Sequence, residues 1–165
     1  MQLNYHILIV DDVADNIQVA MNILKEENYD FSFATSGEAA VTLLSETQFD
    51  LILLDIMMPG IDGYEVCRTI KKNPKFSDIP IIFLTAKADV DSISKGFKVG
   101  GVDYIVKPFH ANELLARVKT HLELYHAKAL LKHHNLSLQV KMEKEELRLL
   151  SELEESQKEI GRAHV

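Results

Sequence analysis

The sequence has a single cysteine, no tryptophan and only four prolines in 165 residues. With Cys67 alone, no intrachain disulfide can form, which is typical of a reducing compartment. Apolar runs are short, and none approaches the roughly 20 residues that a membrane helix needs. Residues 1–5 are too few and too polar for a signal peptide. These absences predict a cytoplasmic protein without a membrane-spanning segment.

A basic surface is also lacking. Acidic residues outnumber basic residues by 25 to 18, which gives a formal net charge of −7. Broad nucleic-acid binding requires a basic face, so no nucleic-acid partner is expected. Apolar residues make up 47% of the chain, which is enough for a hydrophobic core. The length suits one domain of ordinary size with an appendage.

Short apolar runs alternate with segments of helical periodicity. The runs predict strands near 6–10, 30–34, 49–54, 79–84 and 103–106. The segments between and after them predict helices near 15–27, 37–47, 63–72, 90–98 and from 110 onward. Strict alternation of strand and helix predicts an α/β fold with a doubly wound, five-stranded parallel sheet.

Individual residues add detail to this prediction. The first, third and fourth strands are almost uniformly apolar, as expected for strands covered on both faces. The second strand alternates in character and is expected at an edge. Ser36 is expected to cap the second helix, and Gly100 and Gly101 to end the fourth.

The C-terminal part of the chain differs in composition. Residues 112–160 contain no proline or glycine and are rich in Leu, Glu and Lys, so they predict one long helix or two in tandem, with Gly161 as the first break. Apolar spacing is heptad-like in two stretches, 115–129 and 147–160, and polar residues between them interrupt a single register. Such a helix needs a partner, and a homodimer is the expected one. A solvated helical extension is the alternative.

We therefore divide the chain into three parts. Residues 1–122 are predicted to form the globular domain, and residues 123–160 a helical coiled-coil linker. Residues 161–165 have no periodicity and are expected to be a disordered end or a non-native remnant.

Polar side chains follow four of the predicted strands. Asp11 and Asp12 follow the first strand, Asp55 the third, Thr85 the fourth and Lys107 the fifth. Because ligands bind at the carboxyl ends of parallel strands, these side chains are expected to converge at one edge of the sheet.

The residue types at this edge suit phosphoryl transfer. Three carboxylates in one pocket repel each other unless a cation neutralises them, and Mg²⁺ prefers such oxygen ligands. An ionised carboxylate beside Mg²⁺ can attack phosphorus, while a hydroxyl and an ammonium group stabilise the transferring oxygens. Taken singly, each aspartate is as well explained by a turn, and Lys107 by solvation. Their joint placement is what indicates the chemistry.

These residues also carry a family resemblance. The chain resembles the receiver domain of bacterial two-component response regulators over about residues 5–122. The matching motifs are Asp11-Asp12, the segment from Asp55 to Gly63, Thr85-Ala86 and Lys107-Pro108-Phe109. The resemblance implies the flavodoxin-like strand order 2-1-3-4-5.

The resemblance also assigns roles at the metal site. It implies that Asp55 is the phosphoacceptor and that Asp12 and Asp55 ligate Mg²⁺ directly. Asp11 would bind the ion directly or through water, and the backbone carbonyl of Met57 would be a further ligand. The implied phosphoryl donor is a sensor histidine kinase or a phosphotransfer protein.

Further implied roles concern the phosphoryl group and the switch. Thr85 and Lys107 would bind the phosphoryl group, and the bond between Lys107 and Pro108 is expected to be cis. Thr85 and Tyr104 match the switch positions of the family. The Tyr104 ring would turn inward as Thr85 moves toward the phosphate.

Several functions fit this sequence. The first is a phosphorylation-activated module, not itself an enzyme, that signals through its last helix to an output domain outside this sequence. Its linker is similar to those that precede cyclic-dinucleotide enzymes of the HD-GYP phosphodiesterase or GGDEF cyclase type, and a histidine-kinase-type output is a further alternative. A second function is a Mg²⁺-dependent phosphohydrolase with an aspartate nucleophile, although haloacid-dehalogenase-like enzymes carry a second acid where this chain has Met57. A third is a pseudo-receiver that only docks.

Overall fold

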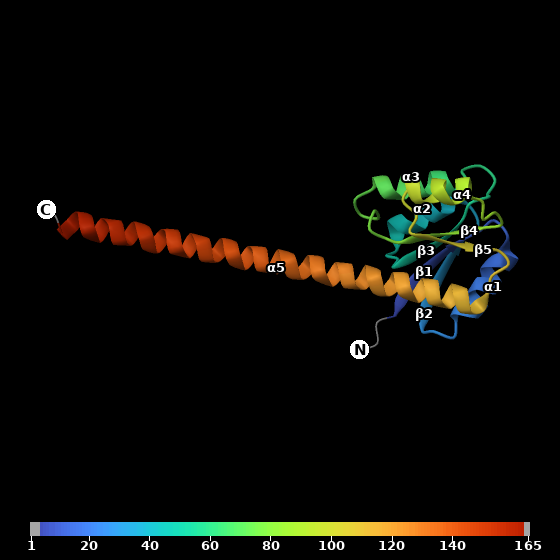
Figure 1. Ribbon diagram of the computed structural model, residues 1–165, viewed down its shortest axis with the longest axis horizontal. Coiled ribbons are helices and arrows are strands. Elements are labelled where there is room, and N and C mark those ends of the chain that lie inside the picture. Colours follow the sequence, from blue (N-terminus) through green and yellow to red (C-terminus); the bar gives the residue numbers. More distant parts are fainter. Residues whose placement is uncertain (1–3, 164–165) are drawn as a thin grey trace. The chain divides into compact units, whose positions relative to one another are not determined.

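A five-stranded parallel sheet forms the centre of the protein (Figure 1). The computed structural model describes residues 4–163. The strand order is β2-β1-β3-β4-β5, with β1 Tyr5–Val10, β2 Tyr29–Ala34, β3 Leu51–Asp55, β4 Ile81–Thr85 and β5 Asp103–Val106. The helices are α1 Ala14–Leu24, α2 Gly37–Glu46, α3 Gly63–Lys72, α4 Val90–Lys98 and α5 Ala111–Ala163. The predicted α/β class and strand order are confirmed, and β2 is an edge strand as expected.

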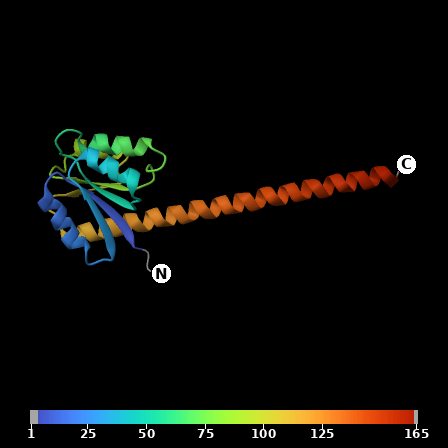
Figure 2. The ribbon, with the colours of Figure 1, turned by 180° about the vertical axis from the view of Figure 1, so that it is seen from behind.

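Helices cover both faces of the sheet (Figures 1 and 2). Helices α2, α3 and α4 lie on one face, and α1 lies on the other with the first turns of α5. Two hydrophobic clusters correspond to these faces. Ile17 of α1 and Val118 of α5 belong to one cluster, whereas Leu44 of α2 and Ile70 of α3 belong to the other.

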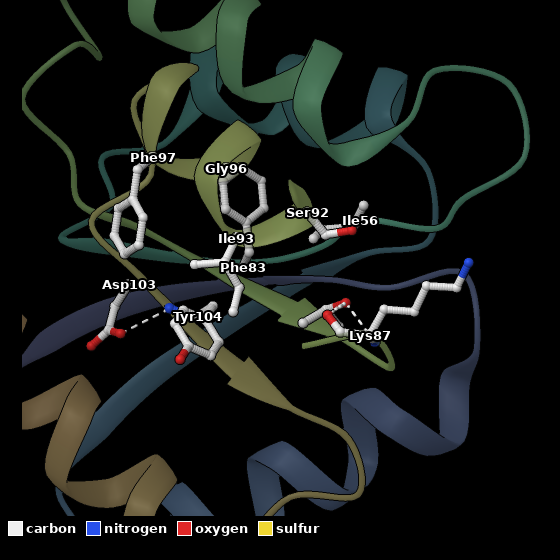
Figure 3. A pocket seen from close by; sticks show the side chains of 10 residues that line it. Ile56, Phe83, Lys87, Ser92, Ile93, Gly96, Phe97, Asp103 and Tyr104 are labelled. Carbon is white, nitrogen blue, oxygen red and sulfur yellow. Dashed lines mark hydrogen bonds between the residues drawn. The ribbon is translucent and has the colours of Figure 1, made fainter. Parts of the chain in front are cut away.

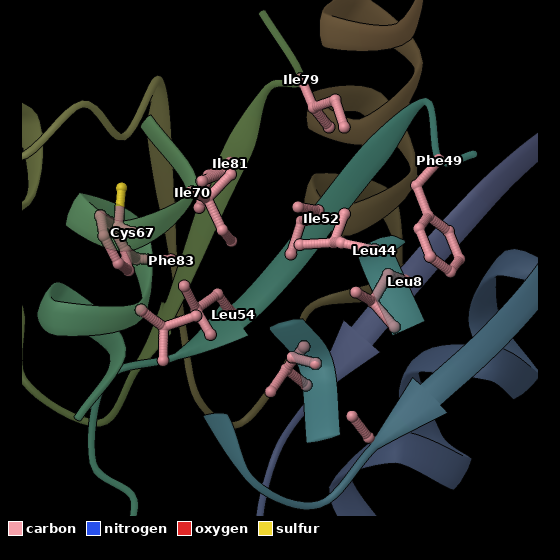
Figure 4. Packing of buried hydrophobic residues seen from close by; sticks show 14 of the residues in the cluster. Leu8, Leu44, Phe49, Ile52, Leu54, Cys67, Ile70, Ile79, Ile81 and Phe83 are labelled. Carbon is pink, nitrogen blue, oxygen red and sulfur yellow. The ribbon is translucent and has the colours of Figure 1, made fainter. Parts of the chain in front are cut away.

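Strands β3 and β4 are buried along their whole length, which confirms that they are covered on both faces. Successive side chains point to opposite faces, so Ile52 packs with Leu54 in one cluster and Leu53 belongs to the other. Figure 4 shows the cluster that contains Ile52 and Leu54, in which Cys67 of α3 packs near Phe83 of β4. The site residues therefore lie at the carboxyl ends of strands that are packed on both faces.

Local signals place the helix ends. The Ser36 hydroxyl accepts a hydrogen bond from the Ala39 N–H at 3.1 Å, which confirms Ser36 as the cap of α2. Helix α4 ends at Lys98, and Gly100 follows with φ of +111°, a conformation that L side chains rarely adopt. Asp62 caps α3 by accepting a hydrogen bond from the Glu65 N–H at 2.9 Å. This cap positions α3 directly after the loop that carries Met57.

The C-terminal helix is one continuous element from Ala111 to Ala163. It passes through Gly161, so the expected break at this residue is wrong for the part that the structure describes. A single glycine costs only about 1 kcal/mol in a helix, which neighbouring Glu, Lys and Arg residues can offset. Contacts divide the chain into two units, one up to Tyr125 and one from His126. Residues 164–165, part of the predicted end segment, lie outside the described residues.

Among residues 4–163, no helix is both long enough and apolar enough to cross a lipid bilayer.

Candidate functional site

Three carboxylates meet where β1 and β3 end. Oxygens of Asp11, Asp12 and Asp55 lie within 4.8 Å of one another. Asp11 is 0% exposed and Asp55 is 3% exposed, whereas Asp12 is open to solvent. The strands bring them together because β1 and β3 are adjacent and parallel, with Val10 beside Leu54 in the register. The predicted convergence of these aspartates is therefore present in the fold.

Lys107 lies against two of these carboxylates. Its Nζ is 2.8 Å from Asp11 Oδ2 and 3.1 Å from Asp55 Oδ1. Burial by itself lowers the pKa of Lys107, but hydrogen bonds to Asp11 and Asp55 more than offset this, so the pKa lies above its usual value. The ammonium therefore stays charged and sits where it can offset charge on a group bound to Asp55. The bond between Lys107 and Pro108 is cis, as expected.

The Asp55 carboxyl is held in an unfavourable electrostatic position. Burial and then the nearby Asp11 charge raise its pKa to about 6, although Lys107 and the Met57 N–H act in the opposite direction. A single lysine thus leaves the negative charge of the site only partly neutralised.

A hard cation fits this set of donors. Asp11 Oδ1 accepts a hydrogen bond from the Val13 N–H at 2.9 Å. Asp11 Oδ2 is fully buried, and its close neighbour is the Lys107 ammonium at 2.8 Å. Oxygen donors with excess negative charge are what Mg²⁺ takes in proteins. The Met57 side chain is 66% exposed in the loop after β3, and a role for its backbone carbonyl stays a prediction.

Thr85 ends β4 beside the site, and its side chain is 3% exposed. Its hydroxyl donates a hydrogen bond to the Lys87 carbonyl at 2.8 Å and accepts one from the Lys87 N–H at 2.9 Å. Both bonds stay within the loop after β4. In this structure the hydroxyl therefore both donates to and accepts from Lys87 of its own loop.

Tyr104 lies on β5, next to Phe83 in the register of β4. Its ring makes an edge-on contact with Phe97 of α4, with centroids 6.4 Å apart, and the Arg117 guanidinium lies 5.8 Å from its centroid. Figure 3 shows Tyr104 and Phe97 at a small pocket that Lys87 also lines. The cavity is about 10 Å³, which is room for about one water molecule. A ring turned inward would therefore need this pocket to widen.

Sequence reasoning missed an ion-pair network beside Tyr104. Asp103 Oδ1 lies 2.6 Å from Arg117 Nη1, and Asp103 Oδ2 lies 3.0 Å from His121 Nε2. Arg117 Nε also lies 3.2 Å from Glu113. Burial alone raises the pKa of Asp103, but hydrogen bonds from Arg117 and His121 bring it below its usual value. The spacing of Glu113, Arg117 and His121 by four residues was the available signal, because such residues share one helix face.

The comparisons with known proteins agree with this geometry. The family model of the response regulator receiver domain matches residues 7–119. The chain is 42% identical over 151 residues to a protein of Vibrio cholerae named as a probable cyclic di-GMP phosphodiesterase, covering 92% of this chain and 33% of that protein. It is 39% identical over 120 residues to the DNA-binding response regulator MtrA of Mycolicibacterium paratuberculosis, covering 73% of this chain and 52% of the relative. The chain thus spans about a third to a half of these relatives.

Solved structures show the same fold. A two-component response regulator from Clostridium difficile is 31% identical, with a TM-score of 0.68 over 73% of this chain and 97% of that chain. The chemotaxis response regulator CheY4 of Vibrio cholerae is 26% identical, with a TM-score of 0.69 over 72% of this chain and 99% of that chain.

The fold, the acidic pocket and these matches define a signalling module. The chain belongs to the response regulator receiver domain family of two-component systems. Receiver domains are generally not enzymes; they bind Mg²⁺ at an acidic pocket and interact with histidine kinases or phosphotransfer proteins.

Proposed function

We propose that Asp55 accepts a phosphoryl group from a histidine kinase or a phosphotransfer protein. The observation that carries this proposal is the buried pair of Asp11 and Asp55, bridged by Lys107 at 2.8 and 3.1 Å. Lys107 orients one oxygen of Asp55 and leaves its other oxygen free of that ion pair. An ionised carboxylate needs no general base to attack phosphorus.

Asp11, Asp12, Asp55 and the backbone carbonyl of Met57 would hold Mg²⁺ at this site. The ion, when bound, offsets negative charge on the transferring oxygens. Lys107 would supply a second positive charge, since its ammonium already contacts Asp55. Together the carboxylates and the lysine would bind and orient the phosphoryl group.

Thr85 and Tyr104 would transmit the phosphorylation of Asp55 to the surface of the domain. To donate to a phosphoryl oxygen, the Thr85 hydroxyl must give up the Lys87 carbonyl, which shifts the loop after β4. That loop and Tyr104 line the same small pocket, so the movement makes room for the ring to turn inward. The ring would then lose its contacts with Phe97 and Arg117, and the surface formed by α4, β5 and α5 would change.

Intact-mass spectrometry after treatment with acetyl phosphate and Mg²⁺ tests this function. The wild-type chain is expected to gain one phosphoryl group, about 80 Da, and Asp55→Asn is expected to gain none. Asp62→Asn is a matched control, because Asp62 is an exposed cap outside the pocket. Uptake by Asp55→Asn, or release of phosphate without any mass increase in the wild-type chain, would contradict the proposal. The second result would favour a phosphohydrolase.

The C-terminal helix would connect the receiver to an output domain. The similarity to the Vibrio cholerae relative covers 151 residues, so it extends beyond the residues 7–119 that the family model matches. This supports a cyclic-dinucleotide enzyme, with a cyclic di-GMP phosphodiesterase favoured over a cyclase. Signalling would proceed by a change in the fraction of chains that pair through this helix. Light scattering before and after phosphorylation tests the last step, and an unchanged mass distribution would contradict it.

A further inference from the structure

The helix from His126 onward exposes two apolar stripes. Large apolar side chains on this segment are 44–71% exposed, so none of them is covered within the described chain. At about 100° per residue, these side chains fall mainly into two groups on different faces of the helix. The first stripe contains Ala127, Leu131, Leu138, Met142, Leu149, Leu153 and Ile160. The second stripe contains Leu136, Val140, Leu147 and Leu150.

The first stripe repeats every 11 residues. Its apolar members continue in steps of three and four residues when three polar residues are included, namely Asn135, Glu146 and Gln157. These polar residues are themselves 11 positions apart, as are Leu138, Leu149 and Ile160. An 11-residue repeat corresponds to about 3.67 residues per turn, so it keeps one straight face over the whole segment. The first stripe therefore follows one regular 11-residue spacing from Ala127 to Ile160.

The first stripe is also the larger of the two. Burying one large apolar side chain removes on the order of 100 Å² of apolar surface from water. Six such side chains on each of two helices remove on the order of 1,200 Å², which exceeds the roughly 1,000 Å² that a specific interface needs. The four side chains of the second stripe remove on the order of 800 Å² and fall short of it.

The polar positions distinguish a parallel pair from an antiparallel one. In a parallel, in-register pair, each of Asn135, Glu146 and Gln157 faces its own copy, and both amide side chains can hydrogen-bond across the interface. In an antiparallel pair centred on Met142, Leu138 would face Glu146. Asn135 would then face Leu149, so polar groups would be buried against leucine without partners. The polar positions of the first stripe therefore favour the parallel arrangement.

We propose that the first stripe is a parallel, in-register seam with a second copy of this chain, and that its supercoil is straight to right-handed. This inference rests on the dimerising role proposed above for the helix and adds the face, the orientation and the period of the pairing. The like charges of the Glu146 layer weaken the seam, which keeps the association reversible.

Disulfide cross-linking of single-cysteine additions tests the orientation. Leu138→Cys and Leu149→Cys are expected to form covalent dimers under mild oxidation, whereas Val140→Cys and Leu147→Cys on the second stripe are not. Met142→Cys should cross-link in either orientation and shows that pairing occurs. The unsubstituted chain is the background control, because its Cys67 is buried. Cross-linking at Met142→Cys without Leu138→Cys, or at the second stripe in preference to the first, would overturn the proposal.

A gain of association tests the face without relying on damage to the fold. Glu146→Leu completes the first stripe and should strengthen dimerisation by about tenfold or more, because it removes a like-charge layer and adds apolar surface. Glu143→Leu is the matched control, since Glu143 lies among the residues of the second stripe. Sedimentation equilibrium of both variants gives the dissociation constants. Strengthening by Glu143→Leu alone, or a monomer in every variant, would refute the seam.

The phosphorylation measurement separates this inference from the proposed function. A chain that gains a phosphoryl group on Asp55 without cross-linking at Leu138→Cys would refute the seam and leave the phosphoryl function intact. Cross-linking at Leu138→Cys in a chain that gains no phosphoryl group would support the seam and refute the phosphoryl function.

Discussion

Replacing Asp55 by asparagine should stabilise the metal-free protein. Asp55 is 3% exposed, and burial together with the Asp11 charge raises its pKa from 3.8 to about 6. The unfolded chain releases this proton near its usual pKa, whereas the folded chain holds it until about pH 6. The folded state therefore binds more protons between these values, and its stability falls as pH rises through this window.

The size of the effect follows from the same shift. One pKa unit corresponds to about 1.4 kcal/mol, so ionised Asp55 destabilises the fold at pH 7 by about 3 kcal/mol at most. The asparagine removes this charge and is expected to recover most of that free energy. Well below pH 4 the wild-type carboxyl is protonated in both states, so the two proteins should then be similar in stability.

Urea unfolding in EDTA, followed by circular dichroism at pH 4, 5, 6 and 7.5, measures the difference. The advantage of Asp55→Asn should grow from less than about 1 kcal/mol at pH 4 to its full value above pH 6. Added Mg²⁺ should reduce this advantage at pH 7.5 by stabilising the wild-type protein. Asp30→Asn, an exposed change on β2, should stay within about 0.5 kcal/mol at every pH. An Asp55→Asn variant that is less stable than the wild type at pH 7.5 would refute the reasoning. So would a gain in stability at pH 4 that is as large as the gain at pH 7.5.

Three further predictions follow from close contacts elsewhere in the domain. Gly63→Ala should destabilise the fold by about 1–3 kcal/mol in urea unfolding, because a Cβ would lie 2.3 Å from the backbone oxygen of Asp55; unchanged stability would contradict this. Leu114→Ala should cost about 2–5 kcal/mol, since Leu114 is fully buried against the sheet, and thermal unfolding at an unchanged temperature would show that α5 is not packed there. Asp103→Asn should cost about 1 kcal/mol at pH 7 by removing the ion pair with Arg117. Because the pKa of Asp103 is lowered, that cost should disappear as pH falls through the lowered value, and a cost that persists at pH 2 would argue against the ion pair.

The fold was largely predictable because its signals are local. Four-residue apolar runs such as Ile7–Val10 indicate strands buried on both faces, and their alternation with helices leaves few topologies. Capping by Ser36 and the end of α4 before Gly100 also depend on neighbouring residues alone. The break expected at Gly161 was wrong because one glycine without other stop signals does not end a helix.

The candidate site could be predicted as a set of residues but not as a geometry. Asp11, Asp55 and Lys107 follow strands, and parallel strands bring their ends to one edge, so their proximity was expected from sequence. The sequence does not show that Lys107 bridges both aspartates or that the Thr85 hydroxyl bonds to the Lys87 carbonyl. These contacts depend on side-chain rotamers and loop paths.

By itself the sequence determined the strands, the helices, the order of the site residues and the repeating apolar positions of the C-terminal helix, since each depends on spacing along the chain. Only the tertiary structure decided which charges are buried together and which side chains brace Tyr104. Arg117 of α5 contacts Asp103 and the Tyr104 ring of β5, which lie 14 and 13 positions before it in the chain. Such electrostatic and packing terms arise from distances in space, and those distances exist only once the sheet and its helices have come together.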